Sequence, residues 1–170
     1  MALEVETGTG KSNADSYITM AELIAYAANR GTTIVDEAAS EQSYIRPAFD
    51  FINALEERLM GFRNTEDQIG AYPRVGVYLR GYERSSSEIP VAVKELQMSL
   101  GLELALGTDI WNRPLSASNP VKRNRVEGVV EQEFAVLNGQ AKISQSRSLA
   151  LISELMGPGG TIGSVALSRG

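Results

Sequence analysis

Residues 91–106 are apolar on nearly every side of the helix that their sequence predicts. Pro90 suits the first turn of such a helix, and Gly107 follows its end. A helix with no polar face belongs at the centre of a bundle or in a subunit interface. Gly101 lies inside this helix and would let a neighbour approach closely, at a cost of about 1 kcal/mol relative to Ala.

Three further helices are predicted around this central one. Thr19 and Glu22 form the capping-box pattern that opens the first of them. Pro47 interrupts the apolar spacing of the second and should kink or divide it near Arg46. The predicted ranges are 20–30, 36 or 40 to 59, and 146–156.

The segments between these helices carry other patterns. Residues 1–18 indicate an irregular arm, and residues 62–88 a long loop rich in Gly, Arg and Tyr. Residues 121–136 suggest a β-hairpin around Glu127-Gly128. The sequence therefore predicts a mainly α fold: a small bundle of about four helices with one β-hairpin, a long central loop and an extended C-terminal tail. Residues 1–156 would form the domain, and residues 157–170 a flexible docking tail.

The composition excludes several kinds of active site. The chain has no cysteine and no histidine, which rules out a thiolate nucleophile, a disulfide framework, a conventional zinc site and a Ser-His-Asp triad. The carboxylates at Glu37, Glu41, Glu56 and Glu57 lack a partner motif on another helix and indicate a solvated face. We therefore expect no enzyme activity and no cofactor or metal.

The run Gly8-Thr-Gly-Lys-Ser12 has some likeness to a phosphate-binding P-loop. That motif needs a glycine five positions before Gly10, where this chain has Val5. It also needs a buried strand before the loop, and only seven residues precede Gly8. The sequence therefore argues against nucleotide hydrolysis.

The charge is unevenly distributed over a chain of net charge −5. Residues 1–60 hold 10 acidic and 4 basic side chains, whereas residues 61–125 hold 7 acidic and 9 basic ones. Arginines alternate with tyrosines in the predicted loop, which fits either a platform for single-stranded nucleic acid or a protein interface. The acidic balance favours an interface between subunits. Its candidate residues are Tyr72, Arg74, Tyr78, Arg80, Tyr82, Lys122, Arg123 and Arg125.

The last fourteen residues include five glycines and keep a few apolar side chains. This composition leaves two interpretations open: folding on a partner, or simple fraying. The acidic amino terminus is not a signal peptide, and no apolar stretch is long enough to span a membrane. We therefore expect a chain made in the cytoplasm that has no membrane partner.

Several collinear stretches together resemble a known family. They are residues 3–10, 14–17, 26–31, 72–76, 89–94 and 121–126. Their order is similar to small phage proteins labelled DnaT-like single-stranded-DNA-binding, which resemble the head–tail adaptor, or head-completion, proteins of tailed bacteriophages. The similarity extends over roughly residues 3–156.

This resemblance implies a structural adaptor in the virion, at the head–tail interface. Such a subunit would form a ring of about twelve copies beneath the portal protein and extend the DNA channel. Its partners would be the portal, neighbouring copies, the next connector or tail-completion protein, and double-stranded genomic DNA passing without sequence-specific contact. The tail would supply the portal-contact candidates Ile162, Val165, Leu167 and Arg169. The alternative function is a single-stranded-DNA-binding accessory protein.

Overall fold

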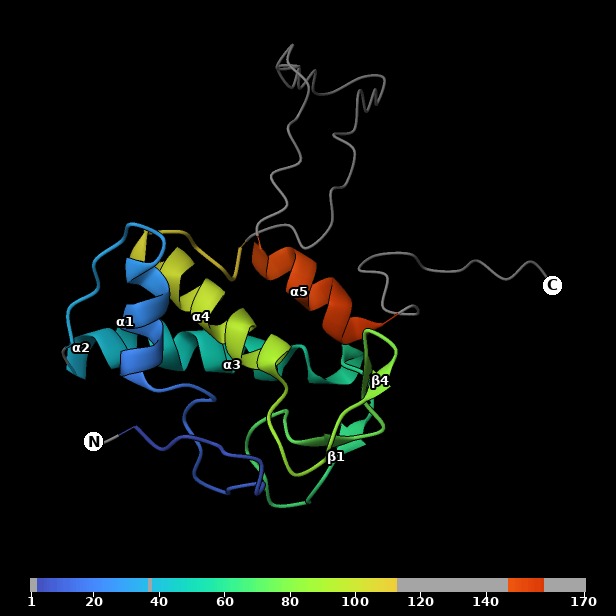
Figure 1. The fold of residues 1–170 in the computed structure, drawn as a ribbon. Helices are drawn as coiled ribbons and strands as arrows, with labels where there is room; N and C mark the ends of the chain where they lie inside the picture. The colour runs from blue at the N-terminus through green and yellow to red at the C-terminus, as the bar shows by residue number, and fades with distance from the viewer. Residues whose placement is uncertain (1–2, 37, 113–146, 158–170) are drawn as a thin grey trace, which may run out of the picture.

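Helix α4 (Val91–Ala105) lies among the other helices in the computed structural model, which describes residues 3–36, 38–112 and 147–157 (Figure 1). It packs against α1, α3, α5 and the π-helical segment η1. The helical elements are α1 (Met20–Ala28), α2 (Ala38–Ser40), η1 (Glu41–Ile45), α3 (Arg46–Ala54), the 3₁₀ turn η2 (Glu56–Arg58), α4 and α5 (Arg147–Met156). None of the helices in these ranges has the length and apolarity needed to cross a membrane.

The central position predicted for α4 is confirmed. Leu96 and Leu100 are fully buried, and the same helix buries residues on other sides, including Val93 and Leu102. A Cβ atom built on Gly101 would lie 3.1 Å from Cδ1 of Leu23, so this glycine does let α1 approach closely. The core divides into two clusters, one where α1 meets η1 and α4 and a larger one where α3, α4 and α5 meet.

A buried amide holds three parts of the chain to α4. The Gln97 side chain is fully buried, and its Nε2 atom donates to Ser16 Oγ (2.9 Å) and to the Ile45 carbonyl (3.0 Å). Its Oε1 atom accepts from the backbone N–H of Tyr17 (2.8 Å). Every polar atom of this buried amide is thus satisfied, and the N-terminal arm and η1 are fixed against α4.

Local signals place the first two helices as predicted. Thr19 and Glu22 form the capping box at the start of α1. In the second helix, Pro47 lies in the first turn of α3, directly after the π-helical residues. The Arg46 N–H bonds to the Glu41 carbonyl, five residues back, so the helix widens just before the proline that interrupts its hydrogen bonds. The predicted division near Arg46 is confirmed.

The predicted fold class is wrong, because residues 62–88 are not a structureless loop in a helical bundle. They contain two antiparallel hairpins: β1 (Phe62–Arg63) with β2 (Arg74–Val75), and β3 (Tyr78–Leu79) with β4 (Tyr82–Glu83). Each strand is only two residues long, so no alternation of apolar and polar residues revealed it. The fold combines helices with two small hairpins, which lie together at one end (Figure 1).

Several predictions concern residues outside the described ranges. The predicted hairpin at 121–136 and the tail after Gly157 both lie there. The arm at residues 3–18 is described, and it folds back on itself. The Glu6 N–H donates to the Ser16 carbonyl, and the Asp15 N–H donates to the Glu4 carbonyl, both at 2.8 Å.

Helix α5 ends against the turn that precedes the hairpins. The Met60 N–H donates to the Leu155 carbonyl at 3.1 Å. Gly157 follows the helix with φ +69°, and a Cβ atom there would lie 2.5 Å from the Met60 sulfur. The positive φ favours glycine at this position, which ends α5 against the flexible Met60 side chain.

Two buried tyrosines join the arm to the first hairpin. The rings of Tyr17 and Tyr72 meet edge to face at 6.4 Å, and the Tyr17 hydroxyl donates to Asn53 Oδ1. Among the described residues, the buried Tyr72 hydroxyl has no hydrogen-bond partner. Burial raises the pKa of Tyr72 to about 12 and also raises the pKa of Tyr17.

We predict that Tyr72→Phe increases the free energy of unfolding at neutral pH by about 1 kcal/mol, because it removes an unpaired buried hydroxyl. A tyrosine has a pKa of about 10 in an unfolded chain. The stability that neutral Tyr72 contributes is therefore present below that pH and is lost as the pH rises toward its folded value of about 12. Urea unfolding measured over this pH range should show that the free energy of unfolding decreases less with rising pH in the variant than in the native chain. A variant clearly less stable than the native chain would contradict the assignment.

Candidate functional site: the hairpin patch

Four large side chains are exposed on the two hairpins, and we call them the hairpin patch: Phe62, Val75, Tyr78 and Tyr82. Their exposed fractions are 81%, 47%, 57% and 71%. Phe62 and Val75 are directly opposite each other in the first hairpin, whereas Tyr78 and Tyr82 lie on the two strands of the second. Tyr78 is paired with Glu83 and Tyr82 with Leu79, so the two rings project from opposite faces of this hairpin. Large apolar and aromatic side chains exposed on neighbouring hairpins are typical of a binding surface.

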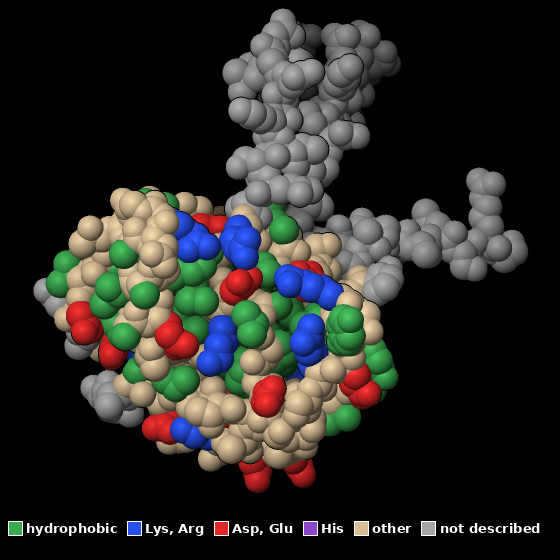
Figure 2. All heavy atoms as spheres, in the orientation of Figure 1, with side chains coloured by type: hydrophobic (Ala, Val, Ile, Leu, Met, Phe, Trp, Pro, Cys, Tyr) green, Lys and Arg blue, Asp and Glu red, His purple; other side chains and the backbone are tan. Residues whose placement is uncertain are grey.

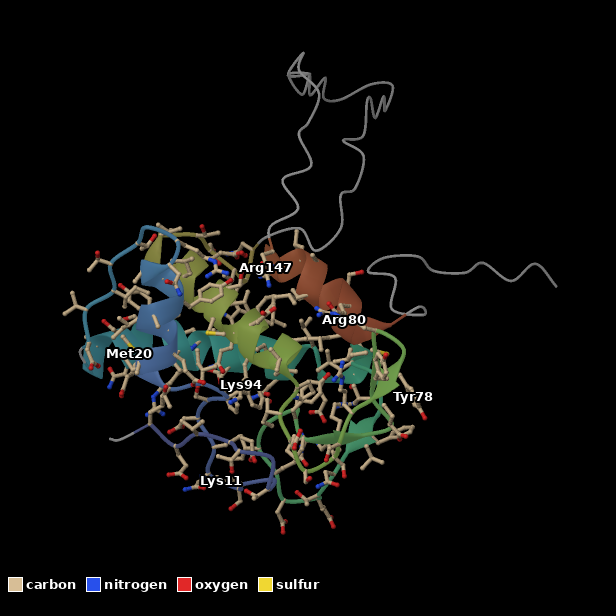
Figure 3. All side chains as sticks on the ribbon, in the orientation of Figure 1. Lys11, Met20, Tyr78, Arg80, Lys94 and Arg147 are labelled. Carbon is tan, nitrogen blue, oxygen red and sulfur yellow. The ribbon has the colours of Figure 1, made fainter. Side chains whose placement is uncertain are left out.

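The second hairpin closes through a two-residue turn. Arg80 and Gly81 both have positive φ, +56° and +82°, which matches the tight turn that best suits the twist of two strands. Arginine rarely adopts this conformation, and here its side chain has a specific partner. The guanidinium forms a two-point contact with Glu154 of α5, at 2.8 and 3.1 Å (Figure 3). This contact ties the second hairpin to α5.

Arg74 supports the hairpins from below. Only 6% of the residue is exposed, and its guanidinium donates to four backbone carbonyls. These acceptors belong to Leu59 (3.3 Å), Met60 (2.8 Å), Gly61 (2.6 Å) and Ala71 (3.2 Å). Arg74 therefore organises the turn that carries Phe62, and it offers no side chain to a ligand on the surface.

The structure separates the interface candidates named from the sequence. Tyr72 and Arg74 are buried, whereas Tyr78, Arg80 and Tyr82 are exposed at the second hairpin. The basic candidates Lys122, Arg123 and Arg125 lie outside the described ranges, as do the tail candidates Ile162, Val165, Leu167 and Arg169. Sequence reasoning missed Phe62 and Val75, because only the cross-strand pairing shows that they share a face.

Most positive charge in the described ranges is already neutralised. These ranges contain ten basic and seventeen acidic side chains, a net charge of −7. Seven of the ten basic groups form ion pairs. Figure 2 shows basic and acidic side chains interspersed over one face, with no basic patch gathered there. The three described cations without an ion pair are Arg30, Arg58 and Arg84.

Arg84 is the unpaired cation that belongs to the hairpins. It follows β4 directly and is exposed, and its guanidinium donates to the Leu79 carbonyl at 3.3 Å. Within the described ranges, no group of three acidic side chains is placed to hold a metal ion. The Glu56 carboxylate is used structurally, since Arg63 bonds to it and lowers the pKa of that carboxyl. The patch can therefore stack, pack and make a few polar contacts.

The comparison with protein families gives one match. A family described as "Putative DnaT-like ssDNA binding protein" matches residues 1–170. The chain belongs to this family. No curated protein and no solved structure matches it. The predicted resemblance to the DnaT-like family is confirmed, whereas its phage-adaptor part stays a prediction.

We predict that Arg74→Lys lowers the free energy of unfolding by about 2–4 kcal/mol, because a single ammonium cannot replace a planar fork that reaches four carbonyls. Arg84→Lys is the matched control, since Arg84 is exposed and its loss should change stability by less than about 0.5 kcal/mol. Urea denaturation of both variants tests this. Equal stability of the two variants would show that Arg74 has no supporting role.

Proposed function

We propose that this chain binds single-stranded DNA and that the hairpin patch is its base-stacking surface. The observation that carries the proposal is the pair of exposed rings, Tyr78 and Tyr82, on a hairpin held by the Arg80–Glu154 contact. The family description supports the same activity. No catalytic step is included in the proposal.

Stacking suits this surface chemically. Every base has an aromatic face, so each exposed tyrosine or phenylalanine ring can hold a base without reading its identity. Phe62, on strand β1, adds a third exposed ring, and β1 lies at the same end of the molecule as β4 (Figure 1). Arg84 lies beside the second hairpin and has a guanidinium free of any described carboxylate, so it can meet one phosphate.

The phosphate backbone needs more positive charge than the described ranges offer. Residues 113–146 hold five basic and three acidic side chains, and Lys122, Arg123 and Arg125 are close in the sequence. We assign the main phosphate contacts to these three residues. Because the described ranges carry a net charge of −7, binding should be weak. The phosphate contacts release counterions, so binding should also decrease with salt.

We predict that Tyr78→Ala with Tyr82→Ala weakens binding to a fluorescent oligo(dT) strand by about tenfold or more, because each stacked base contributes roughly 1–3 kcal/mol. Fluorescence anisotropy at low salt measures the dissociation constant. Leu106→Ala is the matched control, since it removes an equally exposed apolar side chain from the end of α4. Changing Lys122, Arg123 and Arg125 to Glu should abolish binding. Failure of the native chain to bind at about 100 μM protein and low salt would refute the proposal.

A structural adaptor of a phage connector is the second candidate function. It is favoured by the net negative charge of the described ranges and by Phe62 and Val75, two exposed apolar side chains paired across the first hairpin. In a ring of about twelve subunits beneath a portal, such a pair would pack against the next copy. Acidic side chains facing the channel would repel DNA and let it slide. The virion would then be the site of action.

We predict for this candidate that the protein forms rings, alone or on the portal of the same virus, and that Phe62→Ser abolishes them. The side chain is 81% exposed, so the substitution should leave the thermal midpoint of the isolated subunit unchanged. Light scattering after gel filtration and negative-stain imaging measure assembly. Leu106→Ser is the control that should still assemble. A monomer that does not associate with the portal would eliminate the adaptor.

A further inference from the structure

The Glu6 carboxylate is buried without a cation. The residue is 1% exposed, and no lysine or arginine in the described ranges forms an ion pair with it. The nearest basic residue in sequence, Lys11, instead directs its ammonium to Glu4 at 2.5 Å. A buried carboxylate without a counter-charge is unfavourable unless hydrogen bonds to its oxygens compensate.

Backbone amides provide this compensation. Oε1 of Glu6 accepts from the N–H groups of Gly8 (2.7 Å), Thr9 (2.8 Å) and Gly10 (3.0 Å), and Oε2 accepts from Lys11 (2.5 Å). Successive N–H groups converging on one point form a concave anion site of the kind that phosphate-binding loops use. Here the anion comes from the chain itself.

The loop that forms this site is held from outside as well. A Cβ atom at Gly8 would lie 2.1 Å from the Ser87 carbonyl oxygen, and one at Gly10 would lie 2.5 Å from Thr65 Oγ1. The Ile69 N–H also donates to the Lys11 carbonyl at 3.2 Å. Because these contacts do not involve Glu6, they can keep the four N–H groups convergent after the carboxylate is removed.

We propose that residues 8–11 form an anion-binding nest whose resident ligand is the Glu6 carboxylate, and that its ligand class is a small carboxylate. In the native chain the nest is full, so it is closed to the phosphates of a nucleotide. The Gly8-Thr-Gly-Lys run therefore resembles part of a phosphate-binding loop but encloses a carboxylate of its own chain. The inference is independent of the DNA-binding and adaptor proposals.

Chemical rescue tests the nest. We expect Glu6→Ala to lower the thermal midpoint by roughly 10 °C, because four buried N–H groups lose their acceptor. Formate at about 100 mM should restore roughly 3–6 °C of this loss, relative to chloride at equal ionic strength. The native chain should gain nothing from formate. Inorganic phosphate is tested in the same way. Because it is larger than the carboxylate removed, it should restore less of the lost thermal midpoint than formate does.

Glu6→Gln is the matched variant, since it keeps the side-chain volume but presents an amide group to the Lys11 N–H. We expect it to be less stable than the native chain and to be unresponsive to formate, because its side chain still fills the nest. If Glu6→Ala is unfolded in chloride, formate should restore its helical circular dichroism. Absence of any formate-selective gain in Glu6→Ala, or native stability of Glu6→Gln, would overturn the proposal.

Discussion

The buried Gln97 amide is the interaction on which the arrangement of the chain depends. It is the one point where α4 bonds to both the N-terminal arm and η1, through Ser16, Tyr17 and Ile45. An apolar residue there would leave the buried Tyr17 N–H without its acceptor, at a cost of about 1–3 kcal/mol. Apolar packing brings α4 to the centre without fixing its rotation. The directional bonds of Gln97 determine which neighbours it meets on each side.

The two hairpins also depend on directional hydrogen bonds from polar side chains. Arg74 bonds to four carbonyls beneath the first hairpin, and Arg80 bonds to Glu154 beside the second. Strands of two residues have too few mutual bonds to be stable alone. Charged side chains are used as supports here, so the aromatic side chains can remain on the outer surface. This division explains why arginines near the patch contribute little free positive charge.

The sequence predicted those features that have a local cause. The Thr19–Glu22 capping box, the division at Pro47 and the central α4 each follow from neighbouring residues. The hairpins were missed because their strands are only two residues long and because contacts between residues far apart in the sequence support them, notably those of Arg74 with Leu59 and Gly61. The residues of the candidate site could not be identified from the sequence for a similar reason. Tyr78 and Arg74 belong to the same alternation of arginines and tyrosines, so both received the same predicted role. Only the packing shows that Tyr78 is exposed and Arg74 is buried.

The end of α5 has a consequence for any partner that contacts this helix. The Met60 N–H bonds to the Leu155 carbonyl, and Arg80 bonds to Glu154, so consecutive residues of α5 hold the turn that carries Phe62 and the second hairpin. A partner that displaces the end of α5 would therefore also displace both hairpins.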